Sequence, residues 1–136
     1  MLDAQNAPAA PPVIHREDYR PPDWLVPHVD LDFSLAAERT RVRATLWVER
    51  NGDHDRALRL DGDELVPLVV RIDGEETANW ALEEGALVIP LDGQAHRIET
   101  EVELNPAANT KLMGLYASSG LLCTQCEAEG FRRITF

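Results

Sequence analysis

The sequence predicts an all-β fold, an antiparallel β-sandwich, on three observations. Apolar and polar residues alternate in several segments, which is the period of a half-buried strand. Turn-forming residues separate these segments at intervals of roughly 8–12 residues, as they do in sandwiches. Nowhere does the apolar period of a helix persist over three turns. We therefore expect about seven short strands from this chain of 136 residues.

The first two expected strands show the clearest alternation. In residues 29–35, Val29, Leu31 and Phe33 alternate with aspartates and a serine, which predicts a strand with one buried face. Residues 41–49 repeat the pattern with arginine and threonine between the apolar positions. An Asn-Gly pair follows, and both residues tolerate the positive φ that a turn requires.

Shorter strands are expected next. Residues 58–60 end at an Asp-Gly turn, and residues 65–72 form an almost continuous apolar run. Pro67 interrupts this run, and because proline has no N–H for a ladder, it is expected near a strand start, at an edge or in a bulge. Residues 79–82 and 86–91 flank a Glu-Glu-Gly turn, which predicts a hairpin.

Alternation returns in residues 97–104 and then stops. Residues 105–136 mix small, polar and apolar residues without a period, so we expect loops there, and loops carry function more often than strands do. Residues 1–14 are rich in Ala and Pro and are predicted to be a flexible leader. The folded domain is therefore expected to span residues 15–136.

The composition is that of a soluble globular protein, with 44% hydrophobic and 27% charged residues. No window approaches the roughly 18 apolar residues of a membrane-spanning helix, so a membrane is not an expected partner. Residues 1–6 carry neither a basic region nor an apolar core. No secretory signal is expected for that reason, and a cytoplasmic location is predicted.

Acidic residues outnumber basic ones by 24 to 13, which gives a formal charge of −11. Such a field repels phosphate backbones and argues against nucleic acid as a partner. A cationic partner, such as the amine of a peptide, meets a favourable potential. Solubility alone also accounts for a charge of this sign.

The two cysteines, Cys123 and Cys126, form a C-x-x-C pair. A structural zinc site needs four ligands, and no second such pair follows. The four histidines are scattered without ligand spacing, and no βαβ unit favours thioredoxin-like chemistry. Two reduced thiols in a structured loop, a redox or disulfide role, and metal binding remain as three alternatives.

The residues alone indicate no catalytic centre. Glu127 and Glu129 lie two apart, and an extended segment would place their carboxylates on opposite faces. They are not expected to work as one acid–base pair. No H-E-x-x-H, G-x-S-x-G or glycine-rich phosphate loop is present either.

A resemblance to a known family adds to this interpretation. The run C-T-Q-C-E-A-E-G-F-R at 123–132 resembles bacterial aminopeptidase N of the M1 (gluzincin) family of zinc metallopeptidases. The opening H-R-E-D-Y-R-P-P-D at 15–23, L-R-L-D-G at 58–62 and N-P-A-A-N-T at 105–110 follow in the expected order. The similarity covers about residues 15–136.

The resemblance implies a saddle-like N-terminal β-sandwich that packs on a thermolysin-like catalytic domain of the same polypeptide. In that family, a loop of the N-terminal domain enters the active site and recognises the free α-amine of the peptide substrate. The matching positions are Gln125 and Glu127, with Glu127 pairing with the ammonium group. Gln125 would add a hydrogen bond or line the pocket for the first side chain.

The catalytic parts of that family match nothing in this chain. The family's zinc is held by the two histidines of H-E-x-x-H and a downstream glutamate, so the zinc ligands are expected outside the chain and the chain alone is expected to be inactive. The resemblance also implies a domain that is incomplete at its C-terminal end. An unpaired sheet edge is then expected to promote self-association. The alternative is a free-standing β-sandwich that serves as a binding or scaffold module without peptidase activity.

Overall fold

The computed structural model describes residues 10–136, and residues 1–9, most of the predicted leader, lie outside the described part. Residues 10–14 are exposed and belong to no helix or strand. The strands are β1 (Trp24–Ser34), β2 (Thr40–Arg50), β3 (Leu58–Asp61), β4 (Pro67–Ile72), β5 (Glu75–Glu76), β6 (Ala81–Glu83), β7 (Ala86–Ile89), β8 (Ala95–Leu104), β9 (Gly114–Ser118) and β10 (Leu121–Gln125). Three short 3-10 helices complete the described elements: η1 (Arg16–Asp18), η2 (Pro106–Ala108) and η3 (Gly130–Arg133).

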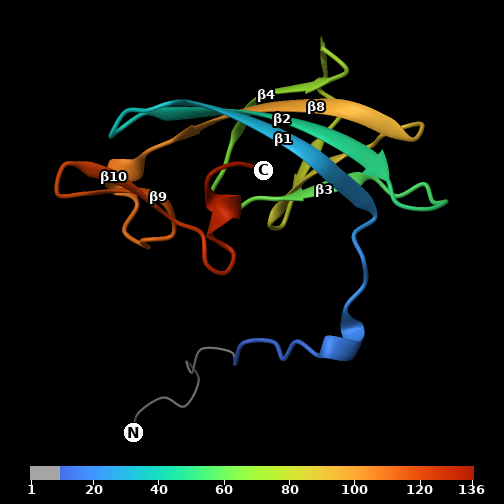
Figure 1. Cartoon of the computed structure of the whole chain (residues 1–136), viewed down its shortest axis with the longest axis horizontal. Helices are drawn as coiled ribbons and strands as arrows, with labels where there is room; N and C mark the ends of the chain where they lie inside the picture. Colours follow the sequence, from blue (N-terminus) through green and yellow to red (C-terminus); the bar gives the residue numbers. More distant parts are fainter. Residues whose placement is uncertain (1–9) are drawn as a thin grey trace, which may run out of the picture.

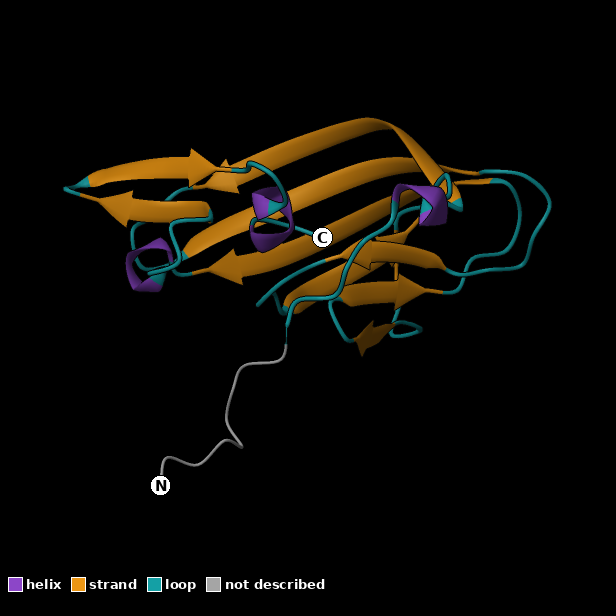
Figure 2. Cartoon of the chain, turned by 90° about the horizontal axis from the view of Figure 1, so that it is seen from below, coloured by secondary structure: helices purple, strands orange, loops and turns teal. Residues whose placement is uncertain are grey.

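The strands form three antiparallel sheets. The large sheet has the order β1-β2-β8-β4-β5, the second sheet β3-β7-β6, and the third is the hairpin β10-β9. The large sheet arches over the second sheet, and the hairpin lies below one of its ends (Figure 1). Figure 2 shows the long strands of the large sheet from below, with the C-terminus under the sheet. The predicted all-β sandwich is confirmed.

The core fills the space between the large and second sheets. The inner faces of β2, β8 and β4 meet those of β3 and β7 there. Its fully buried members include Val42, Val48, Val70, Ile98, Val102, Leu87 and Ile89. Leu115 of β9 and the C-terminal residues Ile134 and Phe136 join the same cluster, which attaches the end of the chain to the sandwich.

Two local predictions are confirmed by the backbone. Pro67 is the first residue of β4, and the register with β8 shifts between Pro67 and Val69, so the missing N–H falls at a strand start beside an irregularity. The strands β6 and β7 form the expected hairpin, with Gly85 at φ +72° in its turn.

Two other expectations were wrong. Residues 105–136 contain the hairpin β9–β10, which closes through Ser119 and Gly120, both at positive φ. Its strands lack clean alternation because neither face is fully covered. The inner face of β1 is also largely open, since Val29 is 41% and Phe33 38% exposed. Strand β1 lies at the edge of the large sheet, where Trp24 is buried in the core and Leu31 packs partly against it. No helix among residues 10–136 is long and apolar enough to cross a membrane.

Candidate functional site

The hairpin β9–β10 leads directly into the predicted recognition loop. Strand β10 ends at Gln125, which pairs with Gly114 at the start of β9. The chain then turns through residues 126–129 into η3. Cys126 is partly buried against the hydrophobic core, whereas its neighbours on both sides are exposed. Burial of this one side chain anchors the loop while Gln125 and Glu127 face solvent.

Gly130 closes the loop tightly on itself. Its N–H donates a hydrogen bond to the carbonyl oxygen of Cys126 at 3.0 Å. A Cβ at Gly130 would lie 2.2 Å from the carbonyl oxygen of Gln125, closer than real Cβ atoms approach. Only glycine therefore fits at this position, and its absence of a side chain sets the shape of the loop.

The structure brings the two predicted site residues together. The backbone N–H of Glu127 donates to Oε1 of Gln125 at 3.0 Å, which assigns the orientation of the Gln125 amide. Within residues 10–136, the Glu127 carboxylate makes no hydrogen bond or ion pair, and neither does the amide nitrogen of Gln125. The loop thus presents an acceptor carboxylate and an N–H donor next to each other.

Glu129 belongs to a different set of contacts. Its carboxylate lies 3.7 Å from the guanidinium of Arg132. The same guanidinium lies 3.3 Å from the carboxylate of Asp61, the last residue of β3. The backbone N–H of Asp63 donates to the carbonyl oxygen of Arg132 at 2.8 Å. A depression of about 350 Å³ lies beside the loop, between Arg59 and Leu60 on one side and Ala128 and Phe131 on the other.

An ion cluster supports the base of the loop from the other side of η3. The Arg133 side chain is only 7% exposed and binds Asp63 and Glu64, each at 2.6 Å. Lys111 also reaches Glu64 at 2.8 Å. Hydrogen bonds from Lys111 and Arg133 lower the pKa of Glu64, so it stays ionised at the centre of the cluster.

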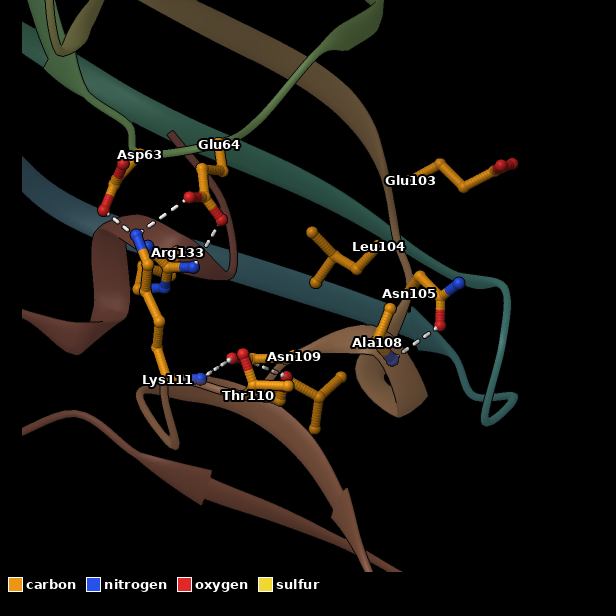
Figure 3. A pocket seen from close by; sticks show the side chains of 11 residues that line it. Asp63, Glu64, Glu103, Leu104, Asn105, Ala108, Asn109, Thr110, Lys111 and Arg133 are labelled. Atoms are coloured by element: carbon orange, nitrogen blue, oxygen red, sulfur yellow. Dashed lines mark hydrogen bonds and ion pairs between the residues drawn. The ribbon is translucent and has the colours of Figure 1, made fainter.

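The ion cluster borders a cavity of about 340 Å³ between η2 and the turn after β3 (Figure 3). Sequence reasoning did not identify Asp63, Glu64 or Arg133. These partners are separated by 69 and 70 positions, so no local spacing connects them. Their contacts hold η3, and with it the loop, against the turn that follows β3.

The residues described by the structure offer no centre for a metal ion. No three of their His, Cys, Asp and Glu side chains converge in a way that could hold one. Cys123 and Cys126 are both free thiols, each partly buried. The residues described by the structure therefore do not fit the zinc implied by the resemblance.

By sequence, the chain is similar to proteins named aminopeptidase N. No protein-family model matches the chain. Aminopeptidase N of Escherichia coli (strain K12) is 46% identical over 126 residues, which cover 93% of this chain and 14% of that protein. Aminopeptidase N of Caulobacter vibrioides is 41% identical over 128 residues, covering 93% and 15%. The protein of the same name from Haemophilus influenzae is 38% identical over 125 residues, covering 90% and 14%.

Solved structures share the fold. The crystal structure of Legionella pneumophila aminopeptidase A in complex with aspartic acid matches 88% of this chain and 15% of that chain, with a TM-score of 0.78 and 29% identity. Native yeast LTA4 hydrolase matches 83% and 20%, with a TM-score of 0.67 and 22% identity, and supports the fold alone. The chain spans only 14–15% of the length of the three relatives matched by sequence.

Proposed function

Because this chain is homologous to the N-terminal domain of aminopeptidase N and has its fold, we propose that it serves an M1-type aminopeptidase by recognising the free α-amine of a peptide. One observation carries this proposal. The Gln125–Glu127 loop holds an exposed carboxylate beside an exposed amide donor, and within residues 10–136 both lack partners.

An ammonium group is the ligand that this pair suits best. A carboxylate accepts charge-assisted hydrogen bonds from an ammonium, and these strengthen when water is excluded around them. The amide nitrogen of Gln125 can donate to a carbonyl oxygen of the same peptide. Because the formal charge of the chain is −11, cationic peptide ends are also attracted over a longer range.

In this proposal the chain positions the peptide and does not cleave it. Holding the amine at Glu127 sets the distance from the peptide end to the scissile bond. Zinc and a general base would be supplied by a catalytic domain of the same polypeptide, where the metal would polarise the carbonyl. The ion cluster of Arg133, Asp63 and Glu64 keeps the loop in place on this side.

Substitution of Glu127 in the complete enzyme tests the proposal. Glu127→Ala should lower kcat/KM for peptides with a free amine about hundredfold, since a charged contact of this kind contributes about 3 kcal/mol. Glu127→Gln should recover part of the loss, because it restores an acceptor without the charge. Glu129→Ala is the matched control and should stay within about threefold of wild type. Equal kinetics for Glu127→Ala and wild type would refute the assignment.

The size of the native protein separates this proposal from a free-standing module. An antibody raised against the chain should detect a band several-fold heavier than 15.2 kDa in the source cells. A band at 15.2 kDa would favour the module instead.

The expected compartment is the cytoplasm, and the structure offers a compatible feature. Cys123 and Cys126 are both unbonded, as suits a reducing environment. Cell fractionation with the same antibody tests this location.

A further inference from the structure

The segment between η2 and β9 has an unusual backbone. Residues 109–113 belong to no helix or strand, and Leu112 has a φ of +56°. Gly114, the first residue of β9, has a φ of +75°. Leucine adopts a left-handed conformation rarely, because its Cβ then crowds the backbone. The segment therefore needs contacts that hold it in this shape.

The side chain of Asn109 supplies these contacts. Its amide nitrogen donates to the carbonyl oxygen of Met113 at 2.8 Å and to that of Leu115 at 2.9 Å. Its Oδ1 accepts from the backbone N–H of Lys111 at 3.1 Å. Both amide hydrogens and the oxygen thus bind backbone groups on the two sides of Leu112, which fixes the orientation of the amide.

Gly114 carries the position of this segment to the Gln125–Glu127 loop. It pairs with Gln125 at the open end of the hairpin β9–β10. A Cβ at Gly130 would lie 3.2 Å from the backbone nitrogen of Gly114 and 2.2 Å from the carbonyl oxygen of Gln125. The backbones of these three residues therefore touch with no side chain between them. A shift of Gly114 displaces both ends of the loop.

Asn109 reaches the loop by a second route as well. It holds the backbone of Lys111, whose Nζ lies 2.8 Å from Glu64 of the ion cluster (Figure 3). Glu64 in turn binds Arg133 of η3, the helix that follows the loop. The loop is thus connected to Asn109 at its start through Gly114 and at its end through the ion cluster.

We infer that Asn109 is a positioning residue for recognition of the peptide amine. It touches no substrate itself, and it acts by fixing Gly114 so that the amide of Gln125 and the carboxylate of Glu127 stay in one place. Fixed placement matters because a hydrogen bond weakens steeply when its donor and acceptor are misaligned. The inference rests on the proposed function and deepens it, since it names a residue that holds the recognition site in position.

A role of Asn109 in folding stability alone would give a different result. Hydrogen bonds that only stabilise the domain change the amount of folded enzyme, so their loss reduces catalysis whether or not Glu127 is present. Hydrogen bonds that act through the loop lose most of their effect once the Glu127 carboxylate is removed, because residues that share one contact are not additive. A double-mutant cycle between Asn109 and Glu127 therefore separates the two roles.

The cycle is measured in the complete enzyme with a peptide that has a free amine. Asn109→Ala should lower kcat/KM about tenfold, less than Glu127→Ala, because the carboxylate is displaced and not removed. In the Glu127→Ala background the same substitution should lower kcat/KM by less than about twofold. The loss caused by Asn109→Ala should also divide between KM and kcat in the same proportion as the loss caused by Glu127→Ala.

A second variant preserves the size of the side chain. Asn109→Asp keeps an oxygen for the N–H of Lys111 but turns an acceptor towards the carbonyl oxygens of Met113 and Leu115. It should lower kcat/KM at least as much as Asn109→Ala, since repulsion replaces two hydrogen bonds. Wild-type kinetics for either variant would overturn the inference.

Asn105→Ala is the matched control from the same part of the chain. Oδ1 of Asn105 accepts from the backbone N–H of Ala108 at 3.1 Å, at the start of η2. Within residues 10–136, the Asn105 side chain makes no hydrogen bond to the hairpin β9–β10. Asn105→Ala should stay within about twofold of wild type in kcat/KM, because it removes one exposed hydrogen bond that does not lead to the loop. A loss equal to that of Asn109→Ala would count against a specific role for Asn109.

Hydrogen exchange gives a measurement that does not depend on catalysis. The N–H of Gly130 donates to the carbonyl oxygen of Cys126, so its exchange reports opening of the loop. In Asn109→Ala this amide should exchange about tenfold faster than in wild type, while the amides of β2 keep their rates. Unchanged exchange at Gly130, or faster exchange throughout the large sheet, would contradict the inference.

The outcomes also separate this inference from the proposed function. Wild-type kinetics for Glu127→Ala would refute amine recognition at Glu127, and with it the role of Asn109 that rests on it. An equal loss from Asn109→Ala in the wild-type and Glu127→Ala backgrounds would refute only the role of Asn109. Failure of both Asn109 variants to fold would refute that role too, since Asn109 would then serve the whole domain.

Discussion

Strands β1 and β2 have the same length and the same alternation, yet their burial is opposite. Each has 11 residues. Val29, Leu31 and Phe33 share one face of β1, and Val42, Ala44, Leu46 and Val48 share one face of β2. On β2, Val42, Ala44 and Val48 are almost completely buried, whereas on β1 Val29 and Phe33 are exposed and Leu31 is only partly buried. The two strands are direct neighbours in one sheet.

The difference comes from the second layer of the sandwich. The sheet β3-β7-β6 packs below β2, β8 and β4, and its core residues Leu58, Leu87 and Ile89 are fully buried there. The alternation of apolar and polar residues therefore determines which side chains share a face of a strand. The neighbouring sheet determines whether that face is buried. The following predictions test how far this difference extends, beginning with the largest effect.

Truncating one valine on each strand should show the difference directly. Val42→Ala removes two buried methyl groups and should lower the free energy of unfolding by about 2–3 kcal/mol. Val29→Ala, at a position 41% exposed, should lower it by about 0.5 kcal/mol. Urea unfolding of both variants measures the contrast. Equal losses would show that β1 is covered in solution.

The turn between the two strands should contribute a smaller amount. Thr40 is fully buried, and its hydroxyl donates to the carbonyl oxygen of Ala36 at 2.7 Å and accepts from the Ala36 N–H at 3.0 Å. Thr40→Val should cost about 1–2 kcal/mol because both Ala36 groups lose this partner. Thr40→Ser keeps the hydroxyl and should cost less than Thr40→Val. The reverse order in urea unfolding would contradict this role.

The pair of His96 and Asp73 should make the stability of the fold depend on pH. The His28 side chain on β1 is 61% exposed, whereas that of His96 on β8 is 17% exposed. Nδ1 of His96 faces Asp73 at 2.7 Å, and Nε2 faces the carbonyl oxygen of Asp92. Both partners are acceptors, so the doubly protonated ring satisfies both.

Desolvation and a nearby arginine, Arg50, lower the pKa of His96, but the hydrogen bonds to Asp73 and Asp92 outweigh them and raise it above 6.5. Its contribution to stability is therefore complete below pH 6.5 and lost as the pH rises through the raised value. His96→Gln should flatten the pH dependence of unfolding above pH 6. An unaltered profile for His96→Gln would contradict this assignment.

The smallest effect should come from the ion pairs between β2 and β8. Arg41 lies 3.3 Å from Glu101 and its side chain is half exposed. Arg41→Gln should cost about 0.5 kcal/mol at low salt and less in 0.5 M salt, because exposed pairs are screened. Chemical denaturation at two salt concentrations measures this, and a loss that grows with salt would be inconsistent with it.

Much of the architecture follows from local patterns in the sequence. The alternation in residues 41–49 and 97–104 placed β2 and β8, and the Glu-Glu-Gly turn placed the hairpin β6–β7. The resemblance at 123–132 pointed to Gln125 and Glu127, and their role in recognition stays a prediction. In the structure the N–H of Glu127 donates to the side chain of Gln125. The hairpin β9–β10 gave no periodic signal, because its faces are covered unevenly.

The sequence by itself determined the class of fold and the faces of the strands, since these depend on neighbours a few positions apart. Only the tertiary structure decided that β1 is an open edge and that Arg133 joins Asp63 and Glu64 beneath the loop. Both depend on which distant segments meet. Burial and ion pairing across some 70 positions arise from packing between layers, and that packing leaves no period in the chain.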